Sequence, residues 1–298
     1  MTPDWIAADW GTSNLRLWAM SEAGDILTAR SSDKGMGKLA PDQFEAALLD
    51  LAGDLLPGGR VTPVVVSGMA GARQGWVEAP YASVPSKPLA GTPVVAPTTD
   101  PRLSVRILPG MSQASPADVM RGEETQIAGY LAGDPQFDGV ICLPGTHTKW
   151  VHISAGEVVS FRSFMTGELF ALLSSQSVLR HSVETGDWDQ TAFEKAAAAT
   201  MSRPQTMAAD LFTLRAESLL SGLAAATARA RLSGLLMGLE LAGARPYWLG
   251  QRIVLIGDTR LSMLYAQLLQ AQGAQPEIAD ATEMTLKGLT AARQTLKG

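Results

Sequence analysis

Hydrophobic residues in the first thirty positions fall into three short runs separated by turn residues. Residues 5–9 are apolar, residues 14–20 alternate between apolar and polar side chains, and a turn at 23–25 leads into a third run at 26–30. Such runs, bounded by glycine and aspartate, are typical of strands. We predict that these strands are antiparallel, because a parallel pair needs a crossover of roughly a dozen residues or more.

The same order of elements recurs after residue 138. An apolar run at 139–143 is followed by Gly145-Thr146, a second strand is predicted over 149–153, and a turn leads to a third strand over 158–162. Aligning Gly11-Thr12 with Gly145-Thr146 brings the two turns almost into register. We therefore interpret the chain as an ancient duplication, with an N-terminal domain over 1–134 and a C-terminal domain over 135–298.

Helices and strands alternate in the rest of the chain, which indicates the α/β class. A helix is predicted over 41–56 from the spacing of Phe44, Leu48, Leu51 and Leu55. The six prolines between 80 and 101 favour loops or edge strands. Further helices are predicted over 123–131, 191–201, 215–244 (as two or three helices), 261–272 and 283–296, and further strands over 63–67, 253–256 and 276–279.

Composition narrows the class of protein. The chain has 298 residues, of which 46% are hydrophobic and 18% charged, and its net charge is −5. These values exclude a disordered chain and provide no basic face for nucleic acid or a membrane surface. The acidic start is unlike a signal peptide, and a single cysteine fits a reducing compartment. We expect a cytoplasmic enzyme that binds neither nucleic acid nor membrane.

Several common catalytic motifs are missing from the sequence. It contains no Walker A motif, no G-x-S-x-G elbow and no H-E-x-x-H. Residues 35–40 match the looser dinucleotide fingerprint G-x-G-x-x-A. A true fingerprint follows the first strand of a parallel unit, whereas this segment follows three antiparallel strands, so we favour a glycine-rich connection.

Two related loops carry the most informative pattern. Each combines glycine with hydroxyl or amide side chains between strands, an arrangement whose backbone N–H groups can bind phosphate oxygens. Asp9 precedes the first loop and could hold Mg²⁺, which prefers carboxylate, water and phosphate ligands. The alternative is two tight hairpins built from turn-favouring residues. The loop residues are Gly11, Thr12, Ser13 and Asn14 in the first copy, and Gly145, Thr146, His147 and Thr148 in the second.

The sequence resembles the 2-dehydro-3-deoxygalactonokinase family of the sugar kinase/heat-shock protein/actin superfamily. The resemblance rests on residues 8–16, 79–85, 120–126, 144–150 and 165–169, and it covers essentially the whole chain. It implies a two-domain actin-like ATPase fold of the duplicated ribonuclease H type, with the active site in a cleft between the domains. It also implies ATP-dependent phosphorylation of the terminal (C6) hydroxyl of 2-dehydro-3-deoxy-D-galactonate in galactonate catabolism.

The superfamily assigns a role to each glycine loop. By this resemblance the two related loops correspond to the motifs called phosphate 1 and phosphate 2, and Gly257 corresponds to part of the adenosine motif. ATP and Mg²⁺ are the implied cofactors, with Asp9 as metal ligand and catalytic residue. Two positions depart from the superfamily pattern: Pro144 replaces the usual aspartate of phosphate 2, and Asp258 replaces a glycine of the adenosine motif.

In superfamily sugar kinases the general base is an acid at the start of a helix, and Glu124 to Ala128 fit that pattern. Glu123 is the competing candidate, because adjacent helical residues point about 100° apart and only one can face the substrate. Asp118 is the next in line. Both glutamates could alternatively complement the helix dipole. Arg16 and Arg121 are candidates for binding the substrate carboxylate.

Other functions on the same fold remain open at this stage. A kinase of a different sugar acid is the main alternative. An actin-like polymer subunit, a chaperone-type switch and a sugar-responsive repressor are non-catalytic alternatives, which usually require inserted subdomains or a DNA-binding arm. The partners expected are the sugar acid, ATP and possible further copies of this chain in a homo-oligomer.

Overall fold

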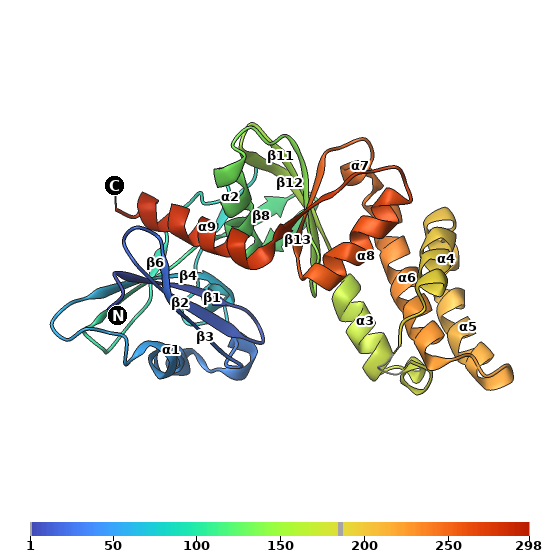
Figure 1. Ribbon diagram of the computed structural model, residues 1–298, viewed down its shortest axis with the longest axis horizontal. Helices are drawn as coiled ribbons and strands as arrows, with labels where there is room; N and C mark the ends of the chain where they lie inside the picture. The colour runs from blue at the N-terminus through green and yellow to red at the C-terminus, as the bar shows by residue number, and fades with distance from the viewer. Residues whose placement is uncertain (1, 184–186, 298) are drawn as a thin grey trace. The chain divides into compact units, whose positions relative to one another are not determined.

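The computed structural model describes residues 2–183 and 187–297, which group into two compact units (Figure 1). The first unit holds the residues up to Asp138, together with Ile153–Ser160 and the segment from Ala279 onward. The second unit holds Gly139–His152 and Phe161–Ile278. The domain boundary at 134/135 stays a prediction, and by contacts the C-terminal segment belongs with the first unit.

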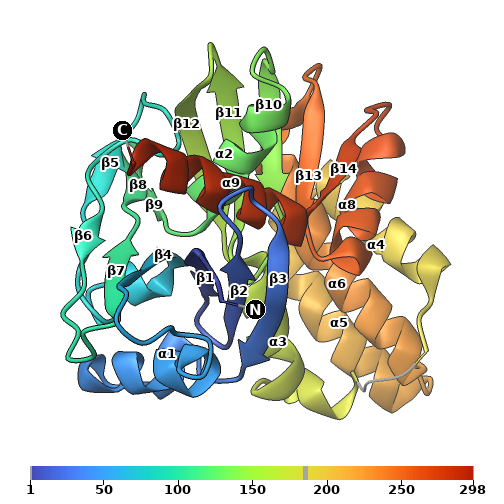
Figure 2. The same cartoon turned by 60° about the vertical axis from the view of Figure 1, so that its left-hand side comes forward.

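The first sheet has six strands in the order β3-β2-β1-β4-β7-β6 (Figure 2). β1 pairs antiparallel with β2, and β2 with β3, which confirms the predicted orientation of the first three strands. β1 and β4 are parallel, as are β4 and β7. The bounds are β1 Trp5–Trp10, β2 Leu15–Met20, β3 Ile26–Ser32, β4 Thr62–Gly68, β6 Val94–Val95 and β7 Leu103–Ile107.

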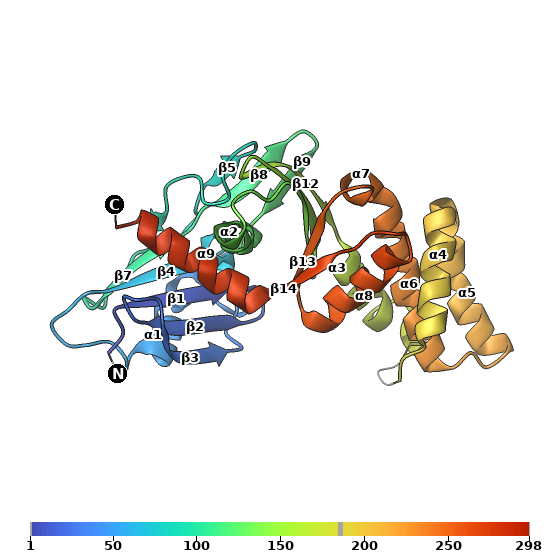
Figure 3. The same ribbon diagram turned by 45° about the horizontal axis from the view of Figure 1, so that its top comes forward.

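Helices cover both faces of this sheet, as Figure 3 shows. Ile6, Ala8 and Trp10 of β1 belong to the buried cluster that includes α1 (Phe44–Ala52). Trp5 and Ala7 belong to the cluster that includes α9 (Ala281–Thr295). Alternate side chains of a strand point to opposite faces, so a continuous apolar run is what a strand covered on both sides requires.

The remaining elements of the first unit include some that the sequence did not predict. α2 (Glu123–Gly133) begins where predicted, but α1 ends at Ala52 rather than 56, just before Gly53. The proline-rich stretch forms only short strands, β5 and β6, as expected. A small sheet in the order β5-β8-β9 was not predicted; its bounds are β5 Tyr81–Ser83, β8 Gly110–Ala114 and β9 Ala117–Met120.

A second sheet has its strands in the order β12-β11-β10-β13-β14 (Figure 2). When the strands of this sheet are numbered along the chain, they lie in the order third, second, first, fourth and fifth. The first sheet without its edge strand β6 has the same order, β3-β2-β1-β4-β7. The shared order supports the duplication predicted from the recurring loops. The bounds are β10 Gly139–Leu143, β11 Thr148–Ser154, β12 Glu157–Phe164, β13 Ile253–Gly257 and β14 Glu277–Asp280.

Helices make up most of the second unit (Figure 1). Its core contains Phe193, Met237, Trp248 and Tyr265, which pack against β10 and β13. The helical region predicted at 215–244 is interrupted at Gly222, whose φ is +67°. The bounds are α3 Thr166–Ser175, α4 Gln190–Ser202, α5 Met207–Leu220, α6 Ala225–Gly243, α7 Arg245–Trp248 and α8 Thr259–Gln270.

Short 3-10 turns occur at Met36–Lys38, Pro41–Gln43, Met69–Gly71, Val178–His181 and Pro204–Thr206. None of the helices within the described ranges is long and apolar enough to cross a membrane. The α/β class and the duplicated strand order agree with the two-domain actin-like fold that the family resemblance implies.

Candidate active site

The predicted phosphate 1 loop connects β1 to β2 and is closed by a hydrogen bond from Gly11 N to Asn14 O at 2.9 Å. The side chains of Thr12, Ser13 and Asn14 are exposed and therefore accessible to a ligand. Beside the loop, Gly68 ends β4 with a φ of +94°. A Cβ on Gly68 would lie 2.6 Å from Trp10 O, so only glycine permits this close approach.

The glycine-rich segment after β3 supports this loop. Met36 N donates to Gly11 O at 3.0 Å and Gly37 N donates to Thr12 O at 2.9 Å. A Cβ on Gly35 would lie only 2.3 Å from the carbonyl carbon of Ser13. The segment that resembles a dinucleotide fingerprint therefore packs against the phosphate 1 loop and holds its backbone in place.

Asp9 is the penultimate residue of β1 and lies directly opposite Arg16 of β2. Arg16 donates to Asp9 Oδ2 from Nη2 at 2.5 Å and from Nε at 3.1 Å, and its Nη1 donates to Thr282 of α9. Both side chains are partly exposed, at 21% for Asp9 and 36% for Arg16. The predicted metal ligand and one predicted substrate ligand thus form an ion pair with each other.

A site for Mg²⁺ would depend on few protein ligands. Within residues 2–183 and 187–297, no cluster of three or more His, Cys, Asp or Glu side chains could hold a metal. Mg²⁺ in phosphoryl-transfer enzymes usually keeps several waters and uses one or two carboxylates plus substrate phosphates. The single carboxylate of Asp9, beside a loop of exposed hydroxyls, fits that requirement.

Glu124 lies at the start of α2 and is fully buried. Its carboxylate accepts hydrogen bonds from Gly122 N at 2.9 and 2.8 Å. Burial, followed by the neighbouring charge of Glu123, raises the pKa of Glu124 to about 8. At neutral pH a carboxyl with this pKa is mostly protonated, so Glu124 must lose this proton before it can act as a general base.

Glu123 is partly exposed, and its Oε2 accepts a hydrogen bond from Arg121 N at 3.0 Å. Both glutamates therefore fold back onto backbone N–H groups at the helix start, as the helix-dipole alternative expects. Next to them, Thr125 and Ser67 share a hydrogen bond of 2.7 Å, and Ser67 pairs with Asp9 across β1 and β4. The two predicted catalytic carboxylates thus belong to connected elements of the same unit.

Arg121 is 9% exposed. Its Nη2 donates to Ala79 O at 2.7 Å, and its guanidinium lies 4.3 Å from the centre of the Tyr81 ring. Its Nε and Nη1 are buried and have no hydrogen-bond partner within the described residues. Arg121 is therefore a buried cation with unused donors in the same unit as Asp9 and Glu124.

The predicted phosphate 2 loop, between β10 and β11, has a support that matches the one in the first unit. A Cβ on Gly167 would lie 2.4 Å from Gly145 O, and Glu168 N donates to Thr146 O at 3.0 Å. His147 and Glu168 also pair through Nε2 and Oε2 at 2.6 Å. In each copy, then, a glycine that follows the third strand packs directly on the loop.

The side chains of the phosphate 2 loop point in different directions. Thr146 and His147 are exposed. Thr148 is buried, and its hydroxyl lies 3.1 Å from the hydroxyl of Tyr265. The Thr148 side chain, predicted to contact phosphate, is thus directed into the second unit.

The predicted adenosine loop adjoins phosphate 2. A Cβ on Gly257 would lie 3.0 Å from Pro144 O, so the two loops touch at that point. Asp258 caps α8, because its Oδ1 accepts from Leu261 N at 3.0 Å. The aspartate that departs from the superfamily pattern therefore has a structural role at the helix start.

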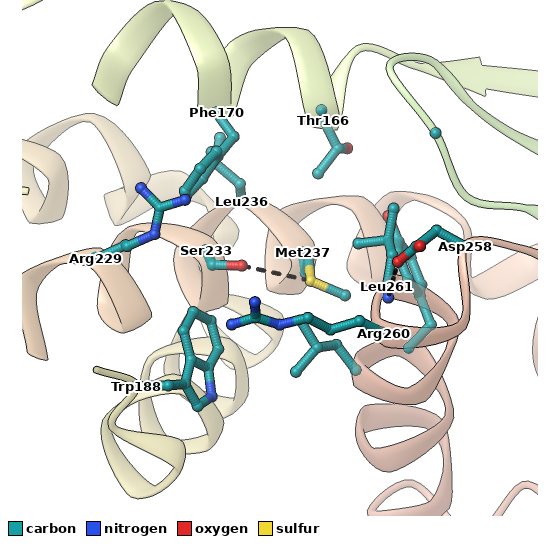
Figure 4. A pocket seen from close by; sticks show the side chains of 14 residues that line it. Thr166, Phe170, Trp188, Arg229, Ser233, Leu236, Met237, Asp258, Arg260 and Leu261 are labelled. Atoms are coloured by element: carbon teal, nitrogen blue, oxygen red, sulfur yellow. Dashed lines mark hydrogen bonds between the residues drawn. The ribbon is translucent and has the colours of Figure 1, made fainter. Parts of the chain in front are cut away.

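A pocket of about 450 Å³ opens beside these loops (Figure 4). Arg229 lies over the Phe170 ring at 4.9 Å, and the Arg260 side chain extends toward Trp188. Apolar walls with a few polar groups are typical of ligand pockets of this size. The lining residues are Gly145, Thr166, Gly167, Phe170, Trp188, Arg229, Ser233, Leu236, Met237, Asp258, Arg260, Leu261, Leu264 and Tyr265.

Sequence reasoning missed most of this lining. Arg260 lies three residues after Gly257, so the sequence could have indicated that it lies beside the predicted adenosine loop. Arg229 and Ser233 lie on α6, inside a long Ala/Leu-rich helix, and nothing in the local sequence marks them.

Comparison with known proteins decides the family. The profile of the 2-keto-3-deoxy-galactonokinase family matches residues 9–292. The chain belongs to this family. The resemblance predicted from the sequence motifs is thereby confirmed, together with the enzyme class, a phosphotransferase with an alcohol group as acceptor.

Individual relatives agree with this family. The chain is 40% identical to a protein of Rhizobium meliloti (strain 1021) that is named for 2-dehydro-3-deoxygalactonokinase activity, over 98% of this chain and 97% of that one. It is 35% identical to the 2-dehydro-3-deoxygalactonokinase of Escherichia coli (strain K12), over 92% and 91% of the two chains.

Solved structures agree on the fold. A crystal structure from Sinorhizobium meliloti, assigned to the same kinase, superposes with a TM-score of 0.90 at 40% identity and covers 98% of this chain and 96% of that one. Component A of the (R)-2-hydroxyglutaryl-CoA dehydratase of Acidaminococcus fermentans superposes with a TM-score of 0.52 at 11% identity, covering 99% of both chains. At that identity the similarity shows the fold alone.

Proposed function

We propose that this protein transfers the γ-phosphoryl group of ATP to the terminal (C6) hydroxyl of 2-dehydro-3-deoxy-D-galactonate, within the catabolism of D-galactonate in the cytoplasm. The match of the family profile over residues 9–292 carries this proposal. Two phosphate loops with the same support in both copies agree with it. The substrates are small molecules, and a homo-oligomer remains a prediction.

Asp9 and the two glycine loops are our candidates for binding the phosphates and the metal. Mg²⁺, when bound, supplies neutralisation of the phosphate charge. Backbone N–H groups and the exposed side chains of Thr12, Ser13 and Thr146 would contact phosphate oxygens. In the structure Arg16 holds Asp9, so we propose that Arg16 releases this carboxylate when a metal binds.

The pocket beside Gly257 is our candidate for the adenosine. Its walls offer Phe170 and Trp188 for contact with a base, and Ser233 as a hydrogen-bonding group. Because the pocket includes Gly145 of phosphate 2, a nucleotide seated there would have its phosphates beside that loop.

Glu124 is our candidate general base. As the sugar oxygen bonds to phosphorus and the bond from phosphorus to ADP breaks, the hydroxyl proton would pass to this carboxylate. Glu123 is partly exposed, lies next to it and is the alternative base. Arg16 and Arg121 remain the candidates for the carboxylate of the sugar acid, and the unused donors of Arg121 favour it of the two.

A panel of 2-keto-3-deoxy sugar acids, incubated with ATP and Mg²⁺, tests this function. We expect ADP release to be fastest with 2-dehydro-3-deoxy-D-galactonate and the product to carry phosphate on C6 by phosphorus–proton coupling. A reaction without the sugar acid is the control. Faster turnover of a different sugar acid, or release of inorganic phosphate without a phosphorylated sugar, would overturn the proposal.

A further inference from the structure

Glu240 lies on α6, inside the second unit, with 2% of its surface exposed. Its Oε1 accepts from Trp150 Nε1 at 2.8 Å and its Oε2 accepts from the Tyr265 hydroxyl at 2.8 Å. The Thr166 hydroxyl also donates to Oε2. Burial of a carboxylate costs free energy unless hydrogen bonds replace those lost to water. The three donors supply these hydrogen bonds and fix the orientation of the Glu240 carboxylate.

Two of these donors are walls of the nucleotide pocket. Thr166 and Tyr265 both line it, from α3 and α8 respectively. The Tyr265 hydroxyl has one proton, which it donates to Glu240. Thr148 must therefore be the donor in its 3.1 Å hydrogen bond with Tyr265. A chain of directed hydrogen bonds thus runs from Thr148 through Tyr265 to Glu240.

The same carboxylate reaches the other side of the phosphate 2 loop through Thr166. Thr166 begins α3, and the next two residues contact the loop backbone: Gly167 packs against Gly145, and Glu168 N donates to Thr146 O. The loop is consequently held at its end by Thr148 and from the side by the start of α3. Both connections converge on Glu240.

We propose that Glu240 is a positioning residue for ATP, which fixes the phosphate 2 loop and the adjoining pocket walls through Thr148, Tyr265 and Thr166. The proposal rests on the proposed function, because it assumes that this loop and pocket bind the nucleotide. Glu240 itself contacts no substrate. Its contribution is the orientation of hydroxyl groups and of the start of α3.

Glu240→Gln tests the orientation while keeping the size of the side chain. A glutamine whose oxygen faces Trp150 would turn its NH₂ group toward Tyr265 and Thr166, so both hydroxyls would have to reverse. Hydrogen bonds to charged groups are among the stronger ones, and their loss corresponds to a change of about tenfold or more. We expect the Kd of a non-hydrolysable ATP analogue, measured by calorimetry, to rise about tenfold, while the KM for the sugar acid changes less than about twofold.

Tyr265→Phe is the second variant, since it keeps the ring and removes only the hydroxyl that joins Thr148 to Glu240. It should weaken binding of the analogue in the same direction. If Glu240→Gln does not fold, Tyr265→Phe alone tests whether the hydrogen bonds to Glu240 support ATP binding. Thr166→Ser, which keeps the hydroxyl, should restore the binding that Thr166→Val loses.

Thr200→Val is the matched control. Thr200 is fully buried in the same unit, but its hydroxyl donates to Ala196 O within its own helix. It should lower thermal stability without changing the Kd of the analogue. If Glu240→Gln and Tyr265→Phe bind the analogue as tightly as Thr200→Val does, Glu240 is only structural and the inference is wrong. Wild-type protein that bound no ATP analogue would instead overturn the proposed function.

Discussion

Gly129 of α2 and Gly288 of α9 let the two helices cross with their backbones in contact. A Cβ on Gly129 would lie 1.9 Å from Met284 O, and one on Gly288 would lie 1.9 Å from Thr125 O. Each glycine thus faces the backbone of the opposite helix, and Thr125 directly follows the candidate base. The position of α2, which carries the candidate base Glu124, depends on this crossing.

Gly129→Ala and Gly288→Ala should each destabilise the protein. The added methyl group has no space, so α2 and α9 must move apart, and overpacking of this kind costs about 1–3 kcal/mol or more. Chemical denaturation monitored by circular dichroism measures the change in the free energy of unfolding. Gly133→Ala, at the end of the same helix, is the control and should change it little, because an added methyl group there would meet no atom within 4 Å. Equal effects at Gly129 and Gly133 would contradict the close crossing.

Asp9→Asn should reduce turnover by orders of magnitude while the fold persists. The substitution removes the carboxylate proposed to bind Mg²⁺ and breaks the partly exposed pair with Arg16, and such pairs contribute about 0–1 kcal/mol to stability. Steady-state kinetics and thermal melting measure the two effects. Asp54→Asn, which breaks a comparable pair with Arg30, is the control and should leave turnover unchanged. Near-normal turnover in Asp9→Asn would contradict the proposed role of Asp9 in the active site.

Glu124→Gln should lower kcat by about 10²–10⁴-fold, the usual contribution of a positioned base. Affinity for ATP and the sugar acid should change little, since the lost interaction develops in the transition state. Glu123→Gln, measured in parallel, should lose much less. If Glu123→Gln is the inactive variant, the two roles exchange. If neither variant loses more than a few-fold, the base lies elsewhere, and Asp118 is the next residue to replace.

The buried Glu124 carboxyl should also make stability depend on pH. Its pKa is about 8 in the folded protein, against an ordinary value of 4.5. The folded state therefore binds this proton more tightly than the unfolded state does. The contribution to stability is fully present below about pH 4.5 and is lost as pH rises through about 8.

Denaturation midpoints between pH 5 and 9 measure this effect. Burial also raises the pKa of Glu240, so the informative quantity is the difference between wild type and Glu124→Gln. We expect the wild type to lose more stability across this range than the variant. Parallel curves for the two proteins would show that Glu124 is ionised in the folded state.

Gly35→Ala should weaken ATP binding by displacing the phosphate 1 loop. The φ of Gly35 is −72°, which any residue can adopt, so the effect would come only from the contact with Ser13. Calorimetry with an ATP analogue measures it. Gly58→Ala, where the added methyl group meets no atom within 4 Å, is the control and should bind the analogue as wild type does.

Local sequence was sufficient to predict the structure where a strand and the loop that follows it are adjacent in the chain. The apolar run before Gly11 and the turn after it predicted the first hairpin, and its register could also have predicted that Arg16 faces Asp9. The β8–β9 hairpin was missed because Gly110–Ala114 lacks both β-branched residues and clear alternation. Glu240 was missed because its partners come from β11, α3 and α8, and no sequence pattern connects residues so far apart.

The contacts of α9 have a consequence for the order in which the protein is made. The first unit combines residues before 139 with residues after 278, and Leu289 and Ala292 of α9 complete the buried cluster on one face of its sheet. Domains usually fold as soon as their residues have been synthesised, beginning with the N-terminal one. The first unit cannot complete this cluster before α9 has been synthesised, so the face of β1 that carries Trp5 and Ala7 lacks these two side chains while residues 161–278 are being made.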